Sequence, residues 1–477
     1  MRTLVWFRGK DLRVSDHAPL RDAIAAGEVV PLFVLDPYFF SKERAPALPH
    51  RMQFLLESVA RLAQNVAHLG SRLLVVAGKS TEVVPSLAAK WMVDRVVAHR
   101  WTEPFGRERD RRVEAALRVP FVLYEGELLA PPASVLTGAG TPFAVFTPFS
   151  KALRVQVEVG PTIPAPRAIP KVPDDVTAAE VALPSLASLG IAKNERLQTG
   201  GERAGRARLA AFLAGPAASY VPDRDRMDRA GTSRLSADLK FGTVSVRTVW
   251  NAAKDAVGLP PAQRAKFHDE LLWREFAHGL LWTRPELLKE PFRRDFAGFP
   301  WRSAKDEPKL WEAWTSGTTG YPVVDAAARQ LLAEGYVHNR ARMISASFLT
   351  KHLLVSLREG EAHYMTFLTD GDWAQNDAGW QWSAGCGCDA QPYFRVFNPT
   401  TQGERFDPDG GYVRAWVPEL AKMPAKYIHQ PAAAPAEVLA AAGVRLGVTY
   451  PRPIVEHAAS RARFLKVAKE HLGRAGA

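Results

Sequence analysis

The first third of the chain alternates short apolar runs with longer amphipathic stretches. The apolar runs are rich in valine, leucine and aromatic residues, as buried strands are, and cover residues 3–7, 29–35, 72–76, 95–99 and 121–124. Between them, apolar residues recur every three or four positions, which predicts helices over 16–26, 52–69, 81–91 and 107–117. Pro31 lacks an N–H, so it indicates an end or an edge of the second strand. The alternation predicts a doubly wound α/β fold with a parallel sheet, which binds ligands at the carboxyl ends of its strands.

The pattern changes after about residue 130. Regular spacing fades from 135 to 189, and five prolines between 159 and 173 deny a helix its hydrogen bonds, which indicates a linker. From 201 onward the helical spacing returns, over 206–213, 246–257, 269–281, 310–314, 322–334, 343–357 and 361–369. We therefore predict an α/β domain over 1–130, a connector over 131–200 and an all-α domain over 201–477.

Composition narrows the class of protein. A chain of 477 residues with 47% hydrophobic and 23% charged residues is long enough for two or three domains with their own cores. The formal charge of +12 favours a polyanionic partner, because neutralised phosphates release counterions. Two cysteines, Cys386 and Cys388, exclude a disulfide framework and lack the further ligands of a structural zinc site, so we expect no metal. No signal-peptide-like start and no long apolar run occur, so we expect a cytoplasmic protein without membrane spans.

Three segments carry candidate chemistry in the helical part. Residues 231–236 (GTSRLS) offer hydroxyls and backbone N–H groups that suit a diphosphate, although an ordinary helix start fits them as well. In 270–276 (ELLWREF), Glu270 shares a helix face with Trp273 and can pair with Arg274; the alternative is a solvated ion pair beside a core tryptophan. Residues 335–343 (GYVHNRARM) gather polar and basic side chains, which a solvated basic turn would also explain.

The most distinctive stretch is 370–398, DGDWAQNDAGWQWSAGCGCDAQPYFRVFN. It places Trp373, Trp380 and Trp382 within ten positions, and in a helix Trp380 and Trp382 cannot share a face. An isolated W-x-W would more simply be two core aromatics, and an isolated DGD a polar turn between helices.

Read together, these segments resemble the DNA photolyase/cryptochrome family. The resemblance runs through WFRGKDLRVSDHAPL at the amino end, EPF, FTPF, GTSRLS, ELLWREF, GYPVVDAA, HNRARM, DGDWAQNDAGWQW and PYFRVFNPTTQGE. It implies an α/β amino-terminal domain that can hold an antenna chromophore, either methenyltetrahydrofolate or an 8-hydroxy-deazaflavin, and an all-α domain that binds FAD. Phe105-Gly106 stand where folate-binding branches often have Asn-Glu, which leaves the antenna open.

The resemblance also assigns residues to the cofactor. Tyr220 and the segment Thr232, Ser233, Arg234, Leu235 and Ser236 would hold the FAD diphosphate. Asp370, Gly371 and Asp372 would meet the flavin ring and ribityl chain, with Arg342 as partner of Asp370, and Asn376 would face flavin N5. Phe267 and Arg274 would face the cofactor.

By the same resemblance, damaged double-stranded DNA is the partner. Glu270 would hydrogen-bond the base edge of the lesion, and Trp273 and Trp382 would enclose the flipped bases. Asn339, Arg340 and Met343 would contact DNA. Family members that act on (6-4) photoproducts have histidines at positions 339 and 343, so this chain favours cyclobutane pyrimidine dimers.

The electron relay of the family is incomplete in this sequence. Trp380 matches the tryptophan nearest the flavin and Trp301 the distal one, but Leu357 occupies the middle position. We hypothesise a detour through Trp373 or Tyr364, which lie close to the gap in sequence.

We thus expect a monomeric deoxyribodipyrimidine photo-lyase. The alternatives are a cryptochrome-type blue-light receptor and a flavin electron-transfer protein that does not bind DNA. The family-like segments run almost to Ala477 and leave no long tail for a signalling output, which favours the enzyme.

Overall fold

The computed structural model describes residues 1–475 and forms two compact units. Unit 1 comprises Met1–Ala218, Ser233–Pro285 and Thr369–Ala374, and unit 2 comprises Ser219–Thr232, Glu286–Leu368 and Gln375–Ala477. Both units combine segments that are far apart in the sequence. The domain boundaries at 130 and 200 therefore stay a prediction.

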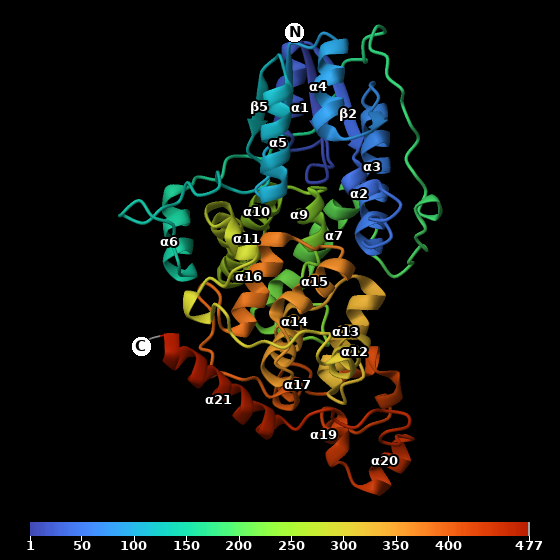
Figure 1. Ribbon diagram of the computed structural model, residues 1–477. Coiled ribbons are helices and arrows are strands. Elements are labelled where there is room, and N and C mark those ends of the chain that lie inside the picture. The colour runs from blue at the N-terminus through green and yellow to red at the C-terminus, as the bar shows by residue number, and fades with distance from the viewer. Residues whose placement is uncertain (476–477) are drawn as a thin grey trace. The chain divides into compact units, whose positions relative to one another are not determined.

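Unit 1 is built around a five-stranded sheet in which every neighbouring pair is parallel (Figure 1). The strand order is β3-β2-β1-β4-β5, with bounds β1(Arg2–Phe7), β2(Glu28–Leu35), β3(Leu74–Ala77), β4(Arg95–His99) and β5(Phe121–Tyr124). The five predicted strands are confirmed. Pro31 lies inside β2 opposite Val5, and pairing with β3 begins only at Leu32, so at the proline β2 has a paired neighbour on one side alone.

Alternate side chains of the strands enter two separate cores, as the period of two requires. Val5 and Phe7 pack with α1(Ala18–Ala26) and α3(Pro49–His68) on one face, whereas Leu4 and Trp6 pack with α4(Ser80–Lys90) and α5(Pro104–Ala116) on the other. Helices thus cover both faces of a parallel sheet, and the predicted doubly wound α/β fold is confirmed.

The remaining helices of unit 1 are α2(Pro37–Phe40), α6(Phe146–Gln156), α7(Glu202–Ala214), α9(Ser236–Phe241), α10(Val246–Asp255) and α11(Pro261–Thr283). Helix α6 lies where the sequence analysis expected no regular structure, so that expectation was wrong. Its buried apolar residues are Phe146, Phe149 and Leu153, a stripe too short to stand out between irregular neighbours.

The loop after β1 packs against the end of α9. Leu12 N–H donates to Phe241 O over 3.2 Å, and Arg13 Nη1 donates to Gly242 O over 2.9 Å. Gly242 has φ 60°, and a Cβ there would overlap the Lys10 carbonyl and lie 2.8 Å from Asp11 N. Only glycine permits this approach, which brings the carboxyl end of β1 against the helical segments of unit 1.

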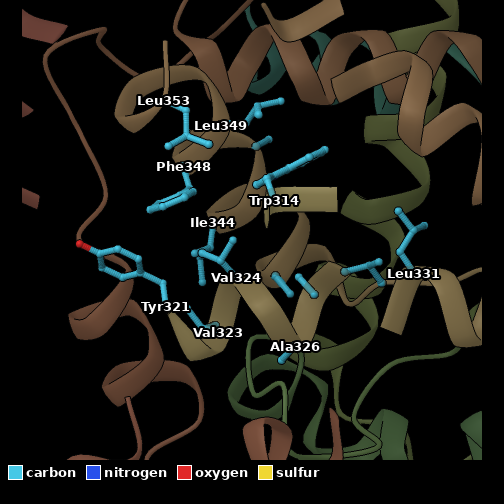
Figure 2. Close-up of a cluster of buried hydrophobic side chains, with 14 of the residues drawn as sticks. Trp314, Tyr321, Val323, Val324, Ala326, Leu331, Ile344, Phe348, Leu349 and Leu353 are labelled. Carbon is cyan, nitrogen blue, oxygen red and sulfur yellow. The ribbon is translucent and has the colours of Figure 1, made fainter. Parts of the chain in front are cut away.

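Unit 2 is helical. Its elements are α8(Tyr220–Asp223), α12(Pro308–Ser316), α13(Pro322–Glu334), α14(Asn339–Ser347), α15(Leu357–Phe367), α17(Pro399–Phe406), α18(Gly411–Trp416), α19(Ala425–Ile428), α20(Ala436–Ala442) and α21(His457–Ala475), and α16(Trp373–Ala384) belongs to it from Gln375 onward. Trp314 of α12 lies in its core among Ile344, Phe348 and Leu349 (Figure 2). No helix among residues 1–475 is long and apolar enough to cross a bilayer.

The single helix predicted over 343–357 is wrong. Helix α14 ends at Ser347, a π-helical turn covers Phe348–His352, and Leu354 has a left-handed φ of 57° before α15 begins at Leu357. Apolar residues continue at helical spacing through the turn, so the hydrophobic period does not reveal the break.

Candidate functional site

A buried network of charges joins the sheet of unit 1 to the DGD segment. Lys10 forms ion pairs with Glu127 and, at 3.2 Å, with Glu103, while Lys240 Nζ lies 2.7 Å from Glu103 Oε1. Asp372 Oδ2 lies 3.5 Å from both ammonium groups, and its Oδ1 lies 3.4 Å from His278 Nε2. All of these side chains are buried, so their charges interact with one another and not with solvent.

The network keeps its carboxylates ionised. Burial alone would raise the pKa of Asp372, but His278, Lys240 and Lys10 outweigh it and hold that pKa well below its usual range. Burial likewise opposes ionisation of Glu127, and Lys10, His278 and Arg274 lower its pKa to about 2. Arg274 also donates from Nη1 to Glu127 O over 2.6 Å. Asp372 is thus a fixed negative charge on the DGD segment, which the family resemblance assigns to the flavin.

The segment 232–236 is split between the units. Thr232 belongs to unit 2, where its hydroxyl lies 3.4 Å from Tyr336 Oη, and Tyr220 opens α8 in the same unit. In unit 1, Arg234 adopts a left-handed φ of 51°, and its carbonyl accepts a hydrogen bond from Gln198 Nε2 over 2.9 Å. The hydroxyls of Ser233 and Ser236 make no hydrogen bond to the described residues, so both remain to donate to an anion. The chemistry of this segment therefore fits a diphosphate.

Helix α11 presents the predicted Glu270 and Trp273. Trp273 is half-buried and stacks on Phe146 of α6, with centroids 3.7 Å apart and planes 7° apart. Glu270 Oε1 lies 3.3 Å from Lys266 Nζ, so the expected pairing with Arg274 gives way to an ion pair with Lys266, because Arg274 is bound to Glu127. Phe267 is buried against Phe212 at 4.8 Å. One face of the Trp273 indole is fixed by stacking.

The predicted DNA-contacting residues open α14. Exposed Asn339 and half-buried Met343 share a face, with 3.7 Å between Nδ2 and Sδ. Arg340 Nη2 lies 2.8 Å from Asp225, and Arg342 Nε donates to Val337 O over 2.8 Å. The helix is capped by His338, whose Nδ1 accepts from Arg340 N.

Helix α16 is held by polar contacts as well as apolar ones. Arg358 Nη1 lies 2.7 Å from Glu361 and 2.6 Å from Asp377, and Gln381 Nε2 donates to Asp377 over 3.0 Å. Burial and the Asp377 carboxylate raise the pKa of Glu361 to about 7. Asn376 Nδ2 donates to Glu361 O over 3.1 Å, which leaves its Oδ1 to accept an N–H group. An amide fixed in this way fits the expected position at flavin N5.

Trp380 is buried on α16, and Trp382 of the same helix is half-buried. The Trp380 ring contacts Tyr364 at 5.3 Å and Trp314 at 6.1 Å between centroids. Trp301 contacts Phe299 at 4.3 Å. Tyr364, one of the two alternative electron carriers hypothesised from the sequence, thus lies beside Trp380. Trp373, Asp370 and Gly371 lie in unit 1, so the pairings of Asp370 with Arg342 and of Trp273 with Trp382 stay predictions.

The carboxyl edge of the sheet offers a second candidate site. Arg8 and Arg109 share Asp110, and both guanidinium groups lie over Trp6 and Trp101 at 4.3–5.6 Å. The Arg8 Nε and Nη2 atoms and Trp101 Nε1 are buried without a hydrogen-bond partner among the described residues. Buried donors that lack a partner are costly, so these three atoms mark a polar spot within the carboxyl edge of the sheet.

Two buried groups within residues 1–475 have the composition of metal ligands, and the chemistry of both argues against metal binding. In Asp11, His17 and His99, Nδ1 of His17 accepts the Leu20 N–H over 3.1 Å, so its Nε2 carries the ring proton and cannot coordinate. In Glu127, His278 and Asp372, Lys10 already supplies the positive charge.

Comparison with known proteins identifies the class. Residues 3–170 match the family described as DNA photolyase, and residues 267–470 match the FAD binding domain of DNA photolyase. A deoxyribodipyrimidine photo-lyase of Agrobacterium fabrum is 39% identical over 470 residues, which cover 97% of this chain and 96% of the relative. The chain therefore belongs to the DNA photolyase family, and it carries that family's FAD-binding domain.

Two solved structures of photolyase and cryptochrome proteins have the same fold as this chain. A bacterial class III photolyase from Agrobacterium tumefaciens superposes with a TM-score of 0.91 at 37% identity, covering 99% of this chain and 98% of the other. A cryptochrome from Synechocystis superposes with a TM-score of 0.90 at 31% identity, covering 98% and 99%.

Sequence reasoning missed Trp311 and Trp314, the contact of Phe146 with Trp273, and the ionic network around Lys10. No sequence motif marks Trp311 and Trp314 or the contact of Phe146 with Trp273. The network could have been suspected from Lys10 and Glu103, which stand at the ends of predicted parallel strands.

Proposed function

We propose that this protein is a deoxyribodipyrimidine photo-lyase that repairs cyclobutane pyrimidine dimers in double-stranded DNA in the light. The observation that carries the proposal is the pair Glu270 and Trp273 on one face of α11. The indole is fixed by Phe146 and half-exposed, and the carboxylate lies one turn away. This arrangement offers a flipped base one stacking surface and one hydrogen-bond partner.

FAD, when bound in its reduced form and excited by light, supplies the electron that splits the dimer. The chain's own residues bind and orient. Tyr220, Thr232, Ser233, Arg234, Leu235 and Ser236 hold the diphosphate. Asp370, Gly371, Asp372 and Arg342 would hold the flavin ring and ribityl chain, with Phe267 and Arg274 facing the cofactor, and Asn376 would offer its Oδ1 as an acceptor at N5. Glu270 binds the base edge, and Trp273 and Trp382 enclose the dimer.

The same site discriminates between lesions. A (6-4) photoproduct requires proton transfer, and Asn339 and Met343 offer no titratable group at the face that meets DNA. His338 is the nearest histidine in sequence, but burial lowers its pKa to about 4 and its Nδ1 caps α14. The geometry therefore supports cyclobutane dimers as the substrate.

The second candidate function is that of a blue-light receptor, which the likeness to the Synechocystis cryptochrome favours. The two functions differ in what light does to a dimer. We further propose that the enzyme is a cytoplasmic monomer that uses no metal, and that its α/β domain can hold an antenna chromophore, either methenyltetrahydrofolate or an 8-hydroxy-deazaflavin.

The test is a duplex with a single thymine dimer, mixed with dithionite-reduced protein under blue light. Recovery of thymine absorbance in the light and none in the dark is expected. Glu270→Gln should lower the rate by about ten- to a hundredfold, as loss of a charged hydrogen bond does, whereas Trp416→Phe on α18 serves as the matched control. Binding of the dimer duplex without any recovery would instead identify a receptor.

A further inference from the structure

Three indole rings connect the interior of unit 2 to its surface. Trp380 and Trp314 are 3% and 1% exposed, and their centroids lie 6.1 Å apart in a T-shaped contact. Trp314 stacks in turn on Trp311, with centroids 5.4 Å apart and planes 30° apart. Trp311 and Trp314 are three residues apart on α12, so they share a face, and Trp311 is half-exposed.

We propose that Trp380, Trp314 and Trp311 form the route by which electrons from solvent reach the flavin, in place of a route through position 357 to Trp301. The proposal rests on the FAD-dependent function proposed above. It concerns reduction of the oxidised cofactor and not the repair step.

The two α12 indoles differ in what can happen to their protons. Trp314 Nε1 donates to the backbone carbonyl of Ser345 over 3.2 Å. A carbonyl does not take up a proton, so an oxidised Trp314 stays a radical cation and can be reduced by its neighbour. Trp311 Nε1 has no acceptor among the described residues and reaches solvent, so an oxidised Trp311 releases its proton to water. Proton loss at the outer end of the chain prevents the electron from returning.

Electrons pass along the three indoles, and protons are exchanged only at Trp311. Trp380 gives one electron to the photoexcited oxidised flavin and becomes a radical cation. Trp314 reduces Trp380, and Trp311 reduces Trp314. The Trp311 radical cation loses its Nε1 proton to water, and a thiol reductant in solution returns one electron and one proton to the neutral radical. The net change is one electron from the thiol to the flavin.

Tyr364 and Trp301, the other aromatic side chains that could pass an electron to Trp380, are less suited to this role. Tyr364 lies 5.3 Å from Trp380, but a phenol must lose its proton when oxidised, and no carboxylate or imidazole in the described chain is hydrogen-bonded to its Oη. Burial also raises the pKa of that hydroxyl. Trp301 has Phe299 as its ring partner within residues 1–475, and phenylalanine is not oxidised at these potentials. His363 contacts both α12 indoles and is neutral, because burial lowers its pKa to about 4, so it does not oppose a positive charge there.

The experiment compares Trp311→Phe and Trp314→Phe with Trp416→Phe, each loaded with oxidised FAD to equal occupancy. After a blue laser flash, transient absorption and electron paramagnetic resonance measure the long-lived neutral tryptophan radical, and steady illumination with dithiothreitol measures flavin bleaching. We expect the radical yield and the bleaching rate to fall by an order of magnitude or more in both α12 variants and to stay unchanged in Trp416→Phe. Trp311 is half-exposed, so its variant keeps the test valid if Trp314→Phe does not fold.

Trp301→Phe and Tyr364→Phe test the competing routes. Loss of the radical in either one, with Trp311→Phe behaving like the wild type, would overturn the proposal. Repair by wild-type protein that dithionite has already reduced requires no relay. Failure there would therefore count against the proposed function alone, and the flash experiment would still decide the route.

Discussion

Gly360 of α15 packs against Trp380, and its replacement by alanine tests how tightly that indole is held. A methyl group at this position would lie 2.5 Å from Cζ3 of Trp380, closer still to Cη2, and 2.6 Å from Cδ2 of Leu349. Trp380 is 3% exposed and Leu349 0%. Neither side chain has free space to move into, so the backbone of α15 or the Trp380 ring must shift.

The magnitude follows from two opposing effects. Glycine to alanine inside a helix stabilises by about 1 kcal/mol. Overpacking a filled core costs about 1–3 kcal/mol, and the overlap with two buried side chains places Gly360→Ala at the upper end of that range. The net destabilisation is about 2 kcal/mol, which corresponds to a Tm lower by about 4–8 °C for a unit of this size.

The matched control is Gly379→Ala on α16, a helical glycine whose added methyl meets nothing within 4 Å. It should stabilise by up to about 1 kcal/mol. Calorimetry gives both Tm values, and near-ultraviolet circular dichroism reports the Trp380 environment. If Gly360→Ala melted at or above the temperature of Gly379→Ala, the close packing of α15 on Trp380 would be refuted.

Three further predictions concern unit 1. Lys10→Met leaves the buried Glu103, Glu127 and Asp372 without their shared cation and should cost about 3–5 kcal/mol in urea unfolding. Lys79→Met, which breaks an ion pair with Glu82 whose side chains are 68% and 69% exposed, should cost less than about 1 kcal/mol; equal costs would contradict the network. Burial raises the pKa of Glu275 from 4.5 to about 7. Between these pH values the folded state keeps Glu275 protonated and the unfolded state does not, so the free energy of unfolding falls as the pH rises from 4.5 to 7. The wild type should therefore lose about 3 kcal/mol relative to Glu275→Gln between pH 4.5 and 7, and parallel stability curves would exclude this. Trp273→Ala should weaken binding of the dimer duplex by about 1–3 kcal/mol and leave its salt dependence unchanged, since no charge is removed; a reduced salt slope in fluorescence titrations would argue against stacking.

Much of the fold was set by local sequence. The five strands and the helices between them follow from the apolar pattern, because the strands are apolar runs buried on both faces and each helix buries one stripe of its residues. The residues assigned to FAD and DNA come from the resemblance of short motifs to those of the family, and these assignments stay predictions. Helix α6 and the break at Phe348–His352 were missed because a short stripe and a continuous apolar spacing carry little information about where a helix begins and ends.

Only the tertiary structure decided which distant groups meet. Lys10, Glu103, Glu127, Lys240 and Asp372 come from five separate segments, and only the folded chain brings their charges together. Trp311 and Trp314 read as core aromatics of a short helix, and their contact with Trp380 exists because α12 and α16 pack into one core. Hydrophobic period and motif are local properties of the chain, whereas ion pairing and ring contact depend on how elements far apart in sequence are packed.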